Sequence, residues 1–136
     1  MSEDLAVKDA DDRFFTALTA MFSGDVAPME DLWSHAGDVV YMGPVPGLFH
    51  KGWKAIDEDW LQQGKMELGG SIEVLERRIT VGGELAVVHH LAKTAGQDPD
   101  DAADQFTLRG TNVFRKEGGA WKLIAHHSDP SPYVHV

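Results

Sequence analysis

Two adjacent histidines near the C-terminus, His126 and His127, are the residues of this sequence best suited to chemistry. They lie in the stretch KLIAHHSDPSPYVHV, whose first half has the pattern of a β-strand. Successive side chains of a strand point to opposite faces of a sheet, so the two imidazoles cannot serve one site. Histidine exchanges protons near neutral pH, and the one that faces a pocket is therefore a candidate acid or base.

The preceding Gly118-Gly119 pair predicts which histidine that is. Two glycines between two strand-like segments are typical of a two-residue hairpin turn, which would set Glu117 opposite Ala120. Cross-strand partners share a face. In that register one face carries Arg109, Thr111, His126 and Ser128, and His127 lies on the other. A bulge or a longer loop would slip the register and reverse the assignment.

Arg109 and His126 form the strongest candidate pair in this register. An arginine can hold a carboxylate or a developing oxyanion while a histidine moves a proton, so the pair predicts proton-transfer catalysis. An ordinary polar patch on the sheet is the alternative reading. The same two interpretations apply to Thr111 and Ser128. They would contact the ligand if this face lines a pocket, and they would be ordinary surface residues if it does not.

His90 is a third histidine that could reach the same cavity. A turn at Gly82-Gly83 would place it on one face with Leu75, Arg77 and Ile79. A core histidine with satisfied hydrogen bonds explains this position equally well. A metal site on His90 and His126 would need a third ligand that the sequence does not locate, so we predict neither a metal nor a cofactor.

Aromatic side chains at helical and strand spacing would form the apolar wall of such a cavity. Trp33, Tyr41 and Trp60 are predicted to contact a ligand, with plain core packing as the competing interpretation. Tyr41 stands out because a buried phenol hydroxyl needs a hydrogen-bond partner.

The elements that must position these residues follow from hydrophobic periodicity and from glycine and proline breaks. We expect helices first, then one short strand, a further helix and a four-stranded antiparallel meander, hence a single α+β domain over residues 1–136. A polar loop at 96–104 would connect the middle strands and be the most mobile segment. The expected helices are 5–22, 28–35 and 53–64, and the expected strands are 38–42, 71–81, 84–95, 104–116 and 120–128.

Composition excludes several classes of function. A net charge of −10 over 136 residues repels phosphate backbones and anionic membranes, so neither nucleic acid nor membrane is expected as a partner. The sequence has no cysteine, and its N-terminus lacks the basic and apolar regions of a signal peptide, which favours a cytoplasmic protein. The acidic runs DADD and DPDDAAD are interpreted as solvated surface.

Several local strings, in this order, resemble the SnoaL-like branch of the nuclear transport factor 2-like superfamily. They are FFTALTAMFSGD, DVVYMGP, HKGWKAIDEDW and LRGTNVFRKEGGAWKLIAHHS, which together span most of the chain. The resemblance implies a cone, in which a curved antiparallel sheet wraps around three N-terminal helices and encloses a pocket. It also implies a homodimer formed through the outer sheet face.

Relatives in this superfamily include ketosteroid isomerase, scytalone dehydratase and the calmodulin-dependent kinase association domain, so the resemblance alone does not choose between catalysis and assembly. The pocket arginines of the association domain correspond here to His90, Thr111 beside Arg109, and Ser128. The carboxylate base of the isomerases and cyclases has its nearest candidates in Asp38 and Asp129.

Two functions remain open at this point. The first is a pocket for a small organic ligand, hydrophobic or carboxylate-bearing, with cofactor-independent isomerase, cyclase or dehydratase chemistry in which His126 is the acid or base. The second is a non-catalytic association or ligand-sensing module that acts as a homodimer.

Overall fold

Helices and strands of the computed structural model occur in the order that the sequence predicts, with one addition, a two-residue strand at His50–Lys51 before the third helix. The structure describes residues 2–44, 47–96 and 106–130. The helices there are α1 (Ser2–Phe22), α2 (Ala27–Leu32) and α3 (Trp53–Met66). The strands are β1 (Val40–Met42), β2 (His50–Lys51), β3 (Ser71–Gly82), β4 (Leu85–Ala95), β5 (Phe106–Glu117) and β6 (Ala120–Pro130).

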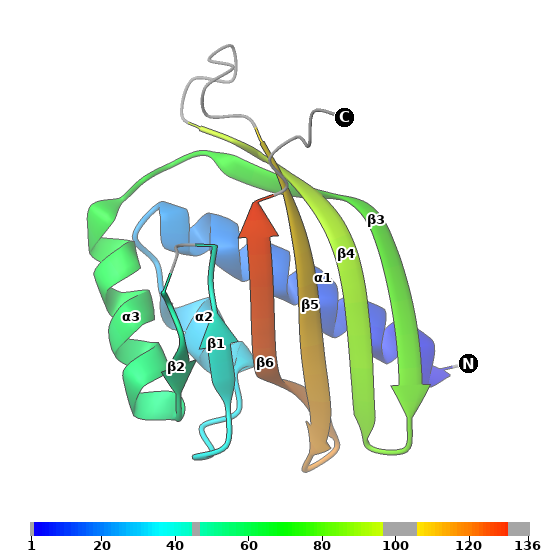
Figure 1. Cartoon of the computed structure of the whole chain (residues 1–136). Helices are drawn as coiled ribbons and strands as arrows, with labels where there is room; N and C mark the ends of the chain where they lie inside the picture. Colours follow the sequence, from blue (N-terminus) through cyan, green and yellow to red (C-terminus); the bar gives the residue numbers. More distant parts are fainter. Residues whose placement is uncertain (1, 45–46, 97–105, 131–136) are drawn as a thin grey trace.

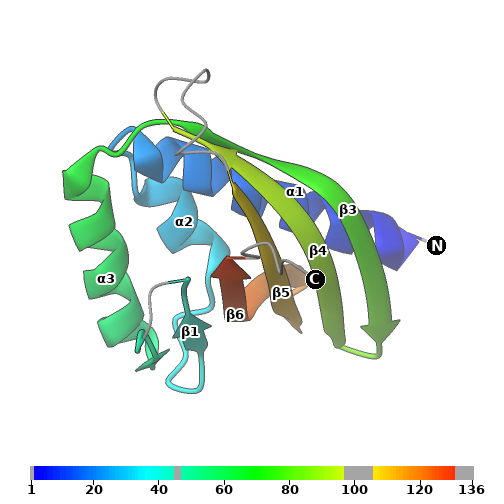
Figure 2. The same cartoon turned by 45° about the horizontal axis from the view of Figure 1, so that its top comes forward.

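The strands form one curved sheet in the order β2-β1-β6-β5-β4-β3. All neighbours pair antiparallel except β1 and β6, which are parallel. Helix α1 runs across one face of the long strands, and α3 stands beside the β1–β2 edge (Figures 1 and 2). This arrangement is the α+β cone expected from the sequence.

Helix α1 is held to the sheet by an apolar stripe with helical spacing. Val7, Phe14 and Met21 recur every seven residues and are fully buried, as this spacing requires for one helix face. The same face carries one exception, Asp11, whose carboxylate is also fully buried. The prediction that the whole run Asp9–Asp12 is solvated is therefore wrong for Asp11.

Helix α3 extends two residues beyond its predicted end at Gly64. It stops after Met66, where Glu67 adopts a left-handed conformation with φ 44°. Gly64 is instead required for packing, because a Cβ at this position would lie 2.5 Å from Cγ2 of Val26. The second helix is shorter than predicted and ends at Leu32, because Trp33 is extended and bridges Leu123 in β6.

The β3–β4 hairpin turns one residue later than predicted. Gly82 pairs with Leu85, so Gly83 and Glu84 form the turn. The predicted faces survive this shift, because Arg77 now pairs with His90 on the inner side. Leu75 is the exception: it occupies a bulge and is half exposed, so the prediction that it shares a face with Arg77 and His90 is wrong.

The β5–β6 hairpin has the predicted two-residue turn but not the predicted register beyond it. Glu117 pairs with Ala120, as expected, and a bulge at Ile124 then inserts one extra residue into β6. Beyond the bulge His126 pairs with Asn112 rather than Thr111, and Arg109 pairs with Asp129 rather than Ser128. The predicted grouping of Arg109 and Thr111 with His126 is therefore wrong.

The predicted mobile loop 96–104 lies outside the described residues beyond Gly96. Among the helices that the structure does describe, none is long and apolar enough to cross a lipid bilayer.

One contact between α2 and α3 should make stability depend on pH. Glu30 and Asp57 approach as a carboxyl pair, and sharing a proton with Asp57 raises the pKa of Glu30. The pair contributes its full stabilisation below pH 4.5, which is the pKa of Glu30 in the unfolded chain. This stabilisation is lost as the pH rises through the higher pKa of Glu30 in the folded protein. Glu30→Gln keeps a donor at every pH, so it should raise the unfolding free energy at pH 7.5 by less than about 1 kcal/mol and leave it unchanged at pH 4.

Urea denaturation at both pH values measures this effect. Glu58→Gln, an exposed carboxylate on α3, is the matched control for the loss of one negative charge. An equal effect of both substitutions at pH 7.5 would assign the gain to net charge instead of the Glu30–Asp57 contact.

Candidate active site

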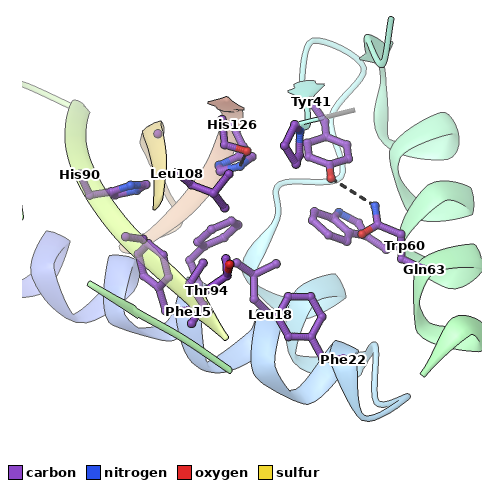
Figure 3. Close-up of a pocket in the computed structure, with 16 residues that line it drawn as sticks. Phe15, Leu18, Phe22, Tyr41, Trp60, Gln63, His90, Thr94, Leu108 and His126 are labelled. Atoms are coloured by element: carbon purple, nitrogen blue, oxygen red, sulfur yellow. Dashed lines mark hydrogen bonds between the residues drawn. The ribbon is translucent and has the colours of Figure 1, made fainter. Parts of the chain in front are cut away.

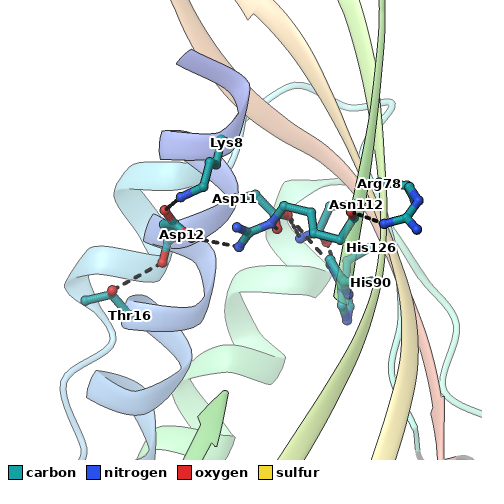
Figure 4. A network of polar contacts seen from close by, with 9 residues as sticks. Lys8, Asp11, Asp12, Thr16, Arg78, His90, Asn112 and His126 are labelled. Carbon is teal, nitrogen blue, oxygen red and sulfur yellow. Dashed lines mark hydrogen bonds and ion pairs between the residues drawn. The ribbon is translucent and has the colours of Figure 1, made fainter. Parts of the chain in front are cut away.

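The buried carboxylate of Asp11 organises the polar groups between α1 and the sheet. Its Oδ2 accepts a hydrogen bond from Nε of Arg77 at 2.8 Å, and its Oδ1 accepts one from Nδ2 of Asn112 at 2.8 Å. Arg77 also binds the neighbouring Asp12 at 2.7 Å (Figure 4). A buried negative charge is thus paired and hydrogen-bonded on both oxygens, which is the condition for keeping it in the interior.

Asp11 fixes the orientation of two further side chains. A carboxylate only accepts, so the Asn112 amide must present its NH₂ group to Asp11 and its Oδ1 to the other side. That Oδ1 lies 2.6 Å from Nδ1 of His126. We infer that His126 carries its proton on Nδ1, so that Nε2 is unprotonated and accepts a hydrogen bond from the hydroxyl group of Ser128 at 3.2 Å.

The environment of His126 keeps this imidazole neutral. The ring is buried, 4.7 Å from the ring of Phe14 and 5.8 Å from that of Tyr41 between centroids. Burial lowers the pKa of His126 to about 3, with smaller contributions from His90 and His127. At neutral pH Nε2 is therefore unprotonated, and it can exchange the hydrogen bond from Ser128 for a proton.

His90 is the second imidazole on the inner face, one strand further along. Its Nε2 lies 3.6 Å from Oδ1 of Asp11, is buried, and has no hydrogen-bond partner within the described residues. Burial lowers the pKa of His90, whereas the nearby Asp11 raises it. The net result is a lowered pKa of His90, so this imidazole is also held toward its neutral form.

Gly110 makes room for this ring. It pairs with His90 across β4 and β5, and a Cβ at Gly110 would lie 2.7 Å from Cε1 of His90. Any larger residue would displace the imidazole from its place beside Asp11.

A second polar chain enters the cavity from α3 and β1. Gln63 donates one amide hydrogen to Oδ2 of Asp59 at 2.7 Å. It donates another to the hydroxyl oxygen of Tyr41 at 3.2 Å (Figure 3). The tyrosine oxygen thus accepts from Gln63, which leaves its own hydrogen for another acceptor. Burial raises the pKa of Tyr41, so the phenol remains a donor throughout the physiological range.

These groups border an apolar cavity of about 100 Å³ under the sheet. Its walls come from α1, α3 and the inner sides of β1, β3, β4, β5 and β6. The polar groups at its surface include Tyr41, Gln63, His90, His126 and Ser128. The arrangement offers a proton acceptor at His126 and a donor at Tyr41 on the walls of one apolar space (Figure 3).

The residues predicted for the site are divided by the structure. His126, His90, Ser128, Tyr41 and Trp60 line this cavity. Trp33 does not line it; it is fully buried and packs behind the rings of Tyr41 and Trp60.

Other predicted groups lie on the outer surface. Arg109 is exposed and Thr111 pairs with the exposed His127, because the bulge at Ile124 shifted their partners. Asp129 forms an ion pair with His127 at 2.8 Å, and Asp38 binds Arg115 at 2.7 Å. Neither Asp129 nor Asp38 contributes a carboxylate to the cavity.

Sequence reasoning missed Asp11, Asn112 and Gln63. A signal for Asp11 was present: it is four residues after Val7 and three before Phe14, in the middle of the apolar stripe. The hairpin register also predicted that Arg77 shares a face with His90, and an arginine on a buried face needs an acidic partner. No comparable signal marked Gln63, whose role depends on the distance between α3 and β1.

Metal chemistry finds no support in these side chains. Among the described residues, no group of three or more histidine and carboxylate side chains is placed to hold an ion.

Comparison with known proteins places this geometry in context. Residues 7–132 match the SnoaL-like domain family. Among proteins with curated functions, none matches the chain.

Solved structures share the fold at low sequence identity. An NTF2-like protein of unknown function from Pseudomonas putida KT2440 has a TM-score of 0.79 and 22% identity over 94% of this chain and 86% of its own. A candidate dehydratase of the NTF2-like family from Streptomyces avermitilis has a TM-score of 0.77 and 22% identity over 97% and 98%. A candidate ketosteroid isomerase from Shewanella frigidimarina has a TM-score of 0.71 and 18% identity over 91% and 94%. At these identities the likeness establishes the fold alone.

The hydrogen-bond chain from Asp11 through Asn112 predicts the tautomer of His126. Nitrogen-15 NMR should show His126 protonated on Nδ1 and neutral from pH 8 down to about pH 4, because its pKa is lowered to about 3. Asn112→Leu removes the acceptor that selects Nδ1 and should mix the two tautomers. A wild-type ring protonated on Nε2 would contradict the chain of donors and acceptors.

The same lowered pKa should appear in acid stability. The unfolded chain takes up a proton on His126 near pH 6.5 and the folded chain only near pH 3, so stability is complete above pH 6.5 and falls as pH drops toward 3. Between pH 6.5 and pH 4 this difference should lower the free energy of unfolding of the wild-type protein by about 3 kcal/mol, measured by urea unfolding. His126→Asn should abolish this decrease. His127→Asn, one residue along on the exposed face, is the matched control and should leave the loss unchanged.

Proposed function

Since the chain belongs to the SnoaL-like domain family, we propose that it is an enzyme that moves a proton on a carbon atom next to a carbonyl group, in an isomerisation or a dehydration. The observation that carries this proposal is the Asp11–Asn112–His126 chain, which holds an unprotonated imidazole nitrogen, hydrogen-bonded to the hydroxyl group of Ser128, at the wall of an apolar cavity. Proton transfer of this kind needs an acceptor for the proton and a donor for the developing oxyanion, and both are present.

His126 is the proposed proton acceptor. Its Nε2 takes the proton as the C–H bond breaks, and the electron pair of that bond becomes an enolate on the substrate. An imidazole whose pKa is near 3 is a weak base in the resting protein. As the reaction proceeds, the negative enolate forms next to the positive imidazolium of His126. Opposite charges attract strongly in this apolar space, so the enolate stabilises the protonated histidine.

Tyr41 is the proposed donor to the substrate oxygen. Its hydroxyl hydrogen is not used by Gln63, and its raised pKa keeps that hydrogen in place. A hydrogen bond from Tyr41 stabilises the enolate oxygen. This role replaces the one that the sequence suggested for Arg109.

The product depends on which atom of the substrate receives the proton back from the His126 imidazolium. Delivery to a different carbon isomerises the substrate. Delivery to a β-hydroxyl group, as its C–O bond breaks, releases water and leaves an enone. In both cases His126 ends neutral, so the chain needs no net supply of protons.

His90 and Asp11 complete the electrostatics of the pocket. Asp11 provides negative charge within 3.6 Å of His90 and, through Asn112, next to His126. Either imidazole can therefore carry a transient positive charge.

The alternative function, a non-catalytic association module, gains no favouring observation from the structure. A homodimer through the outer sheet face is a separate proposal that is compatible with catalysis. That face carries apolar side chains such as Leu85 and Leu91.

A model substrate tests the proposed chemistry. 4-Hydroxy-4-phenylbutan-2-one has a proton next to its carbonyl and a β-hydroxyl group, so water loss gives an enone that absorbs in the near ultraviolet. The wild-type protein should accelerate both this absorbance change and deuterium exchange at the α-carbon in D₂O. His126→Asn should lower the rate at least about 100-fold, the usual worth of a general base.

Two further variants separate chemistry from folding. Tyr41→Phe should also slow the reaction about 100-fold while the thermal unfolding midpoint stays close to that of the wild type. His127→Asn should react at the wild-type rate. Equal rates for His126→Asn and His127→Asn, or no acceleration by the wild-type protein, would disprove the proposal.

A further inference from the structure

A second, larger chamber adjoins the cavity beneath the sheet. The inner chamber has a volume of about 100 Å³ and the outer one of about 880 Å³. Both are bordered by the same ring of side chains, which forms a neck between them: Phe22, Tyr41, Pro44, Gln63, Thr94 and Leu108. A ligand can therefore occupy both chambers at once.

The size of the inner chamber limits what can react there. An apolar protein cavity of about 150 Å³ accommodates one benzene molecule. The inner chamber is smaller than that, so it holds a short group such as an acetyl or hydroxyketone unit but not a ring. Any ring or long chain attached to the reacting group must lie in the outer chamber.

The outer chamber is built to hold apolar matter. Its described walls include Leu48, Met66, Leu68 and Phe106, and the last three are between 46% and 63% exposed. Exposed apolar side chains gathered at the mouth of a cavity are typical of a site that covers apolar ligand surface.

Charge decides which ligands are accepted. Neither chamber has a lysine or an arginine among its described lining residues. Residues 45–46, 97–105 and 131–136, which the structure does not describe, contain no lysine or arginine either. The one charged side chain lining the chambers within the described chain is Asp59, which would repel an anion.

Resting on the function proposed above, we propose that the substrate is an uncharged molecule with a short carbonyl-bearing head and a long apolar tail. The head lies in the inner chamber between His126 and Tyr41, and the tail passes the neck and fills the outer chamber. Carboxylates of the same shape are rejected, because they would lose their hydration without gaining a positive partner.

Matched ligands test the charge rule by direct binding. Decanoate and 2-undecanone carry a carboxylate or an acetyl group on the same nine-carbon chain. Intrinsic tryptophan fluorescence reports binding, because Trp60 lines the inner chamber. At pH 8 we expect 2-undecanone to bind at least tenfold more tightly than decanoate. Equal or tighter binding of decanoate, or no binding of 2-undecanone, would overturn the proposal.

The tail is tested with a series of methyl ketones. From 2-pentanone to 2-nonanone the affinity should rise about threefold for each methylene group, as expected for transfer of a chain into an apolar site. Leu108→Trp narrows the neck and should remove this dependence on length. An affinity that does not grow beyond 2-pentanone would show that the outer chamber holds no tail.

Asp59 is tested with a charge-matched pair on α3. Asp59→Asn removes the charge but keeps an amide oxygen that can accept from Gln63, so it should strengthen decanoate binding about fivefold, the size expected from one partly screened charge, and change 2-undecanone binding by less than about twofold. Glu58→Gln removes an equal charge from the exposed side of the helix and should change neither ligand. Equal effects of the two substitutions on decanoate would contradict the role of Asp59.

The binding measurements test the proposed ligand class, and the catalytic measurements test the proposed enzyme function, so either proposal can be refuted without the other. Ketone binding without α-proton exchange would refute the enzyme function and keep the ligand class. Proton exchange on the model ketone together with equal binding of decanoate and 2-undecanone would refute the ligand class and keep the function.

Discussion

The buried carboxylate of Asp11 is the contact on which both the packing and the site depend. It lies where α1 crosses the sheet, and its two oxygens bind Arg77 of β3 and Asn112 of β5. Removing any one partner would leave a buried charge or donor unsatisfied, which costs far more than an ordinary surface contact. The bond to Asn112 also sets the orientation of its amide, and through it the tautomer of His126. The interaction that locks the helix to the sheet therefore also prepares the proton acceptor.

A single extra residue in β6 determines which histidine belongs to the site. Leu123 faces inward and pairs with Phe114. Strict alternation from Leu123 would turn His127 inward and His126 outward. The bulge at Ile124 reverses the alternation, so that Leu123 and His126 are both buried. This local irregularity thus positions the candidate base beside Asn112.

The polar and the apolar side chains of the pocket walls have different roles. The sheet supplies acceptors at His126 and His90, and β1 with α3 supplies the donor at Tyr41, supported by Gln63 and Asp59. Aromatic rings such as Trp60, stacked on Tyr41 at 4.7 Å between centroids, exclude water from the space between them. In this low-dielectric setting a proton transfer creates charges that attract each other strongly. The outer chamber adds apolar surface, which can contribute binding energy without taking part in the chemistry.

The sequence alone was enough to predict the three helices and the four long strands, the family and its α+β cone through the resemblance, and the face that Arg77 shares with His90. These features depend on local periodicity, on glycine turns and on the order of strings along the chain, all of which can be read from neighbouring residues. Only the tertiary structure decided the partners of His126, since the bulge at Ile124 arises from the fit of β6 against β5 and the helices. It also decided that Asp11 is buried although the acidic residues around it are solvated. Burial of a charge is governed by the partners that other elements bring to it, and no local pattern around Asp11 names Arg77 and Asn112 as those partners.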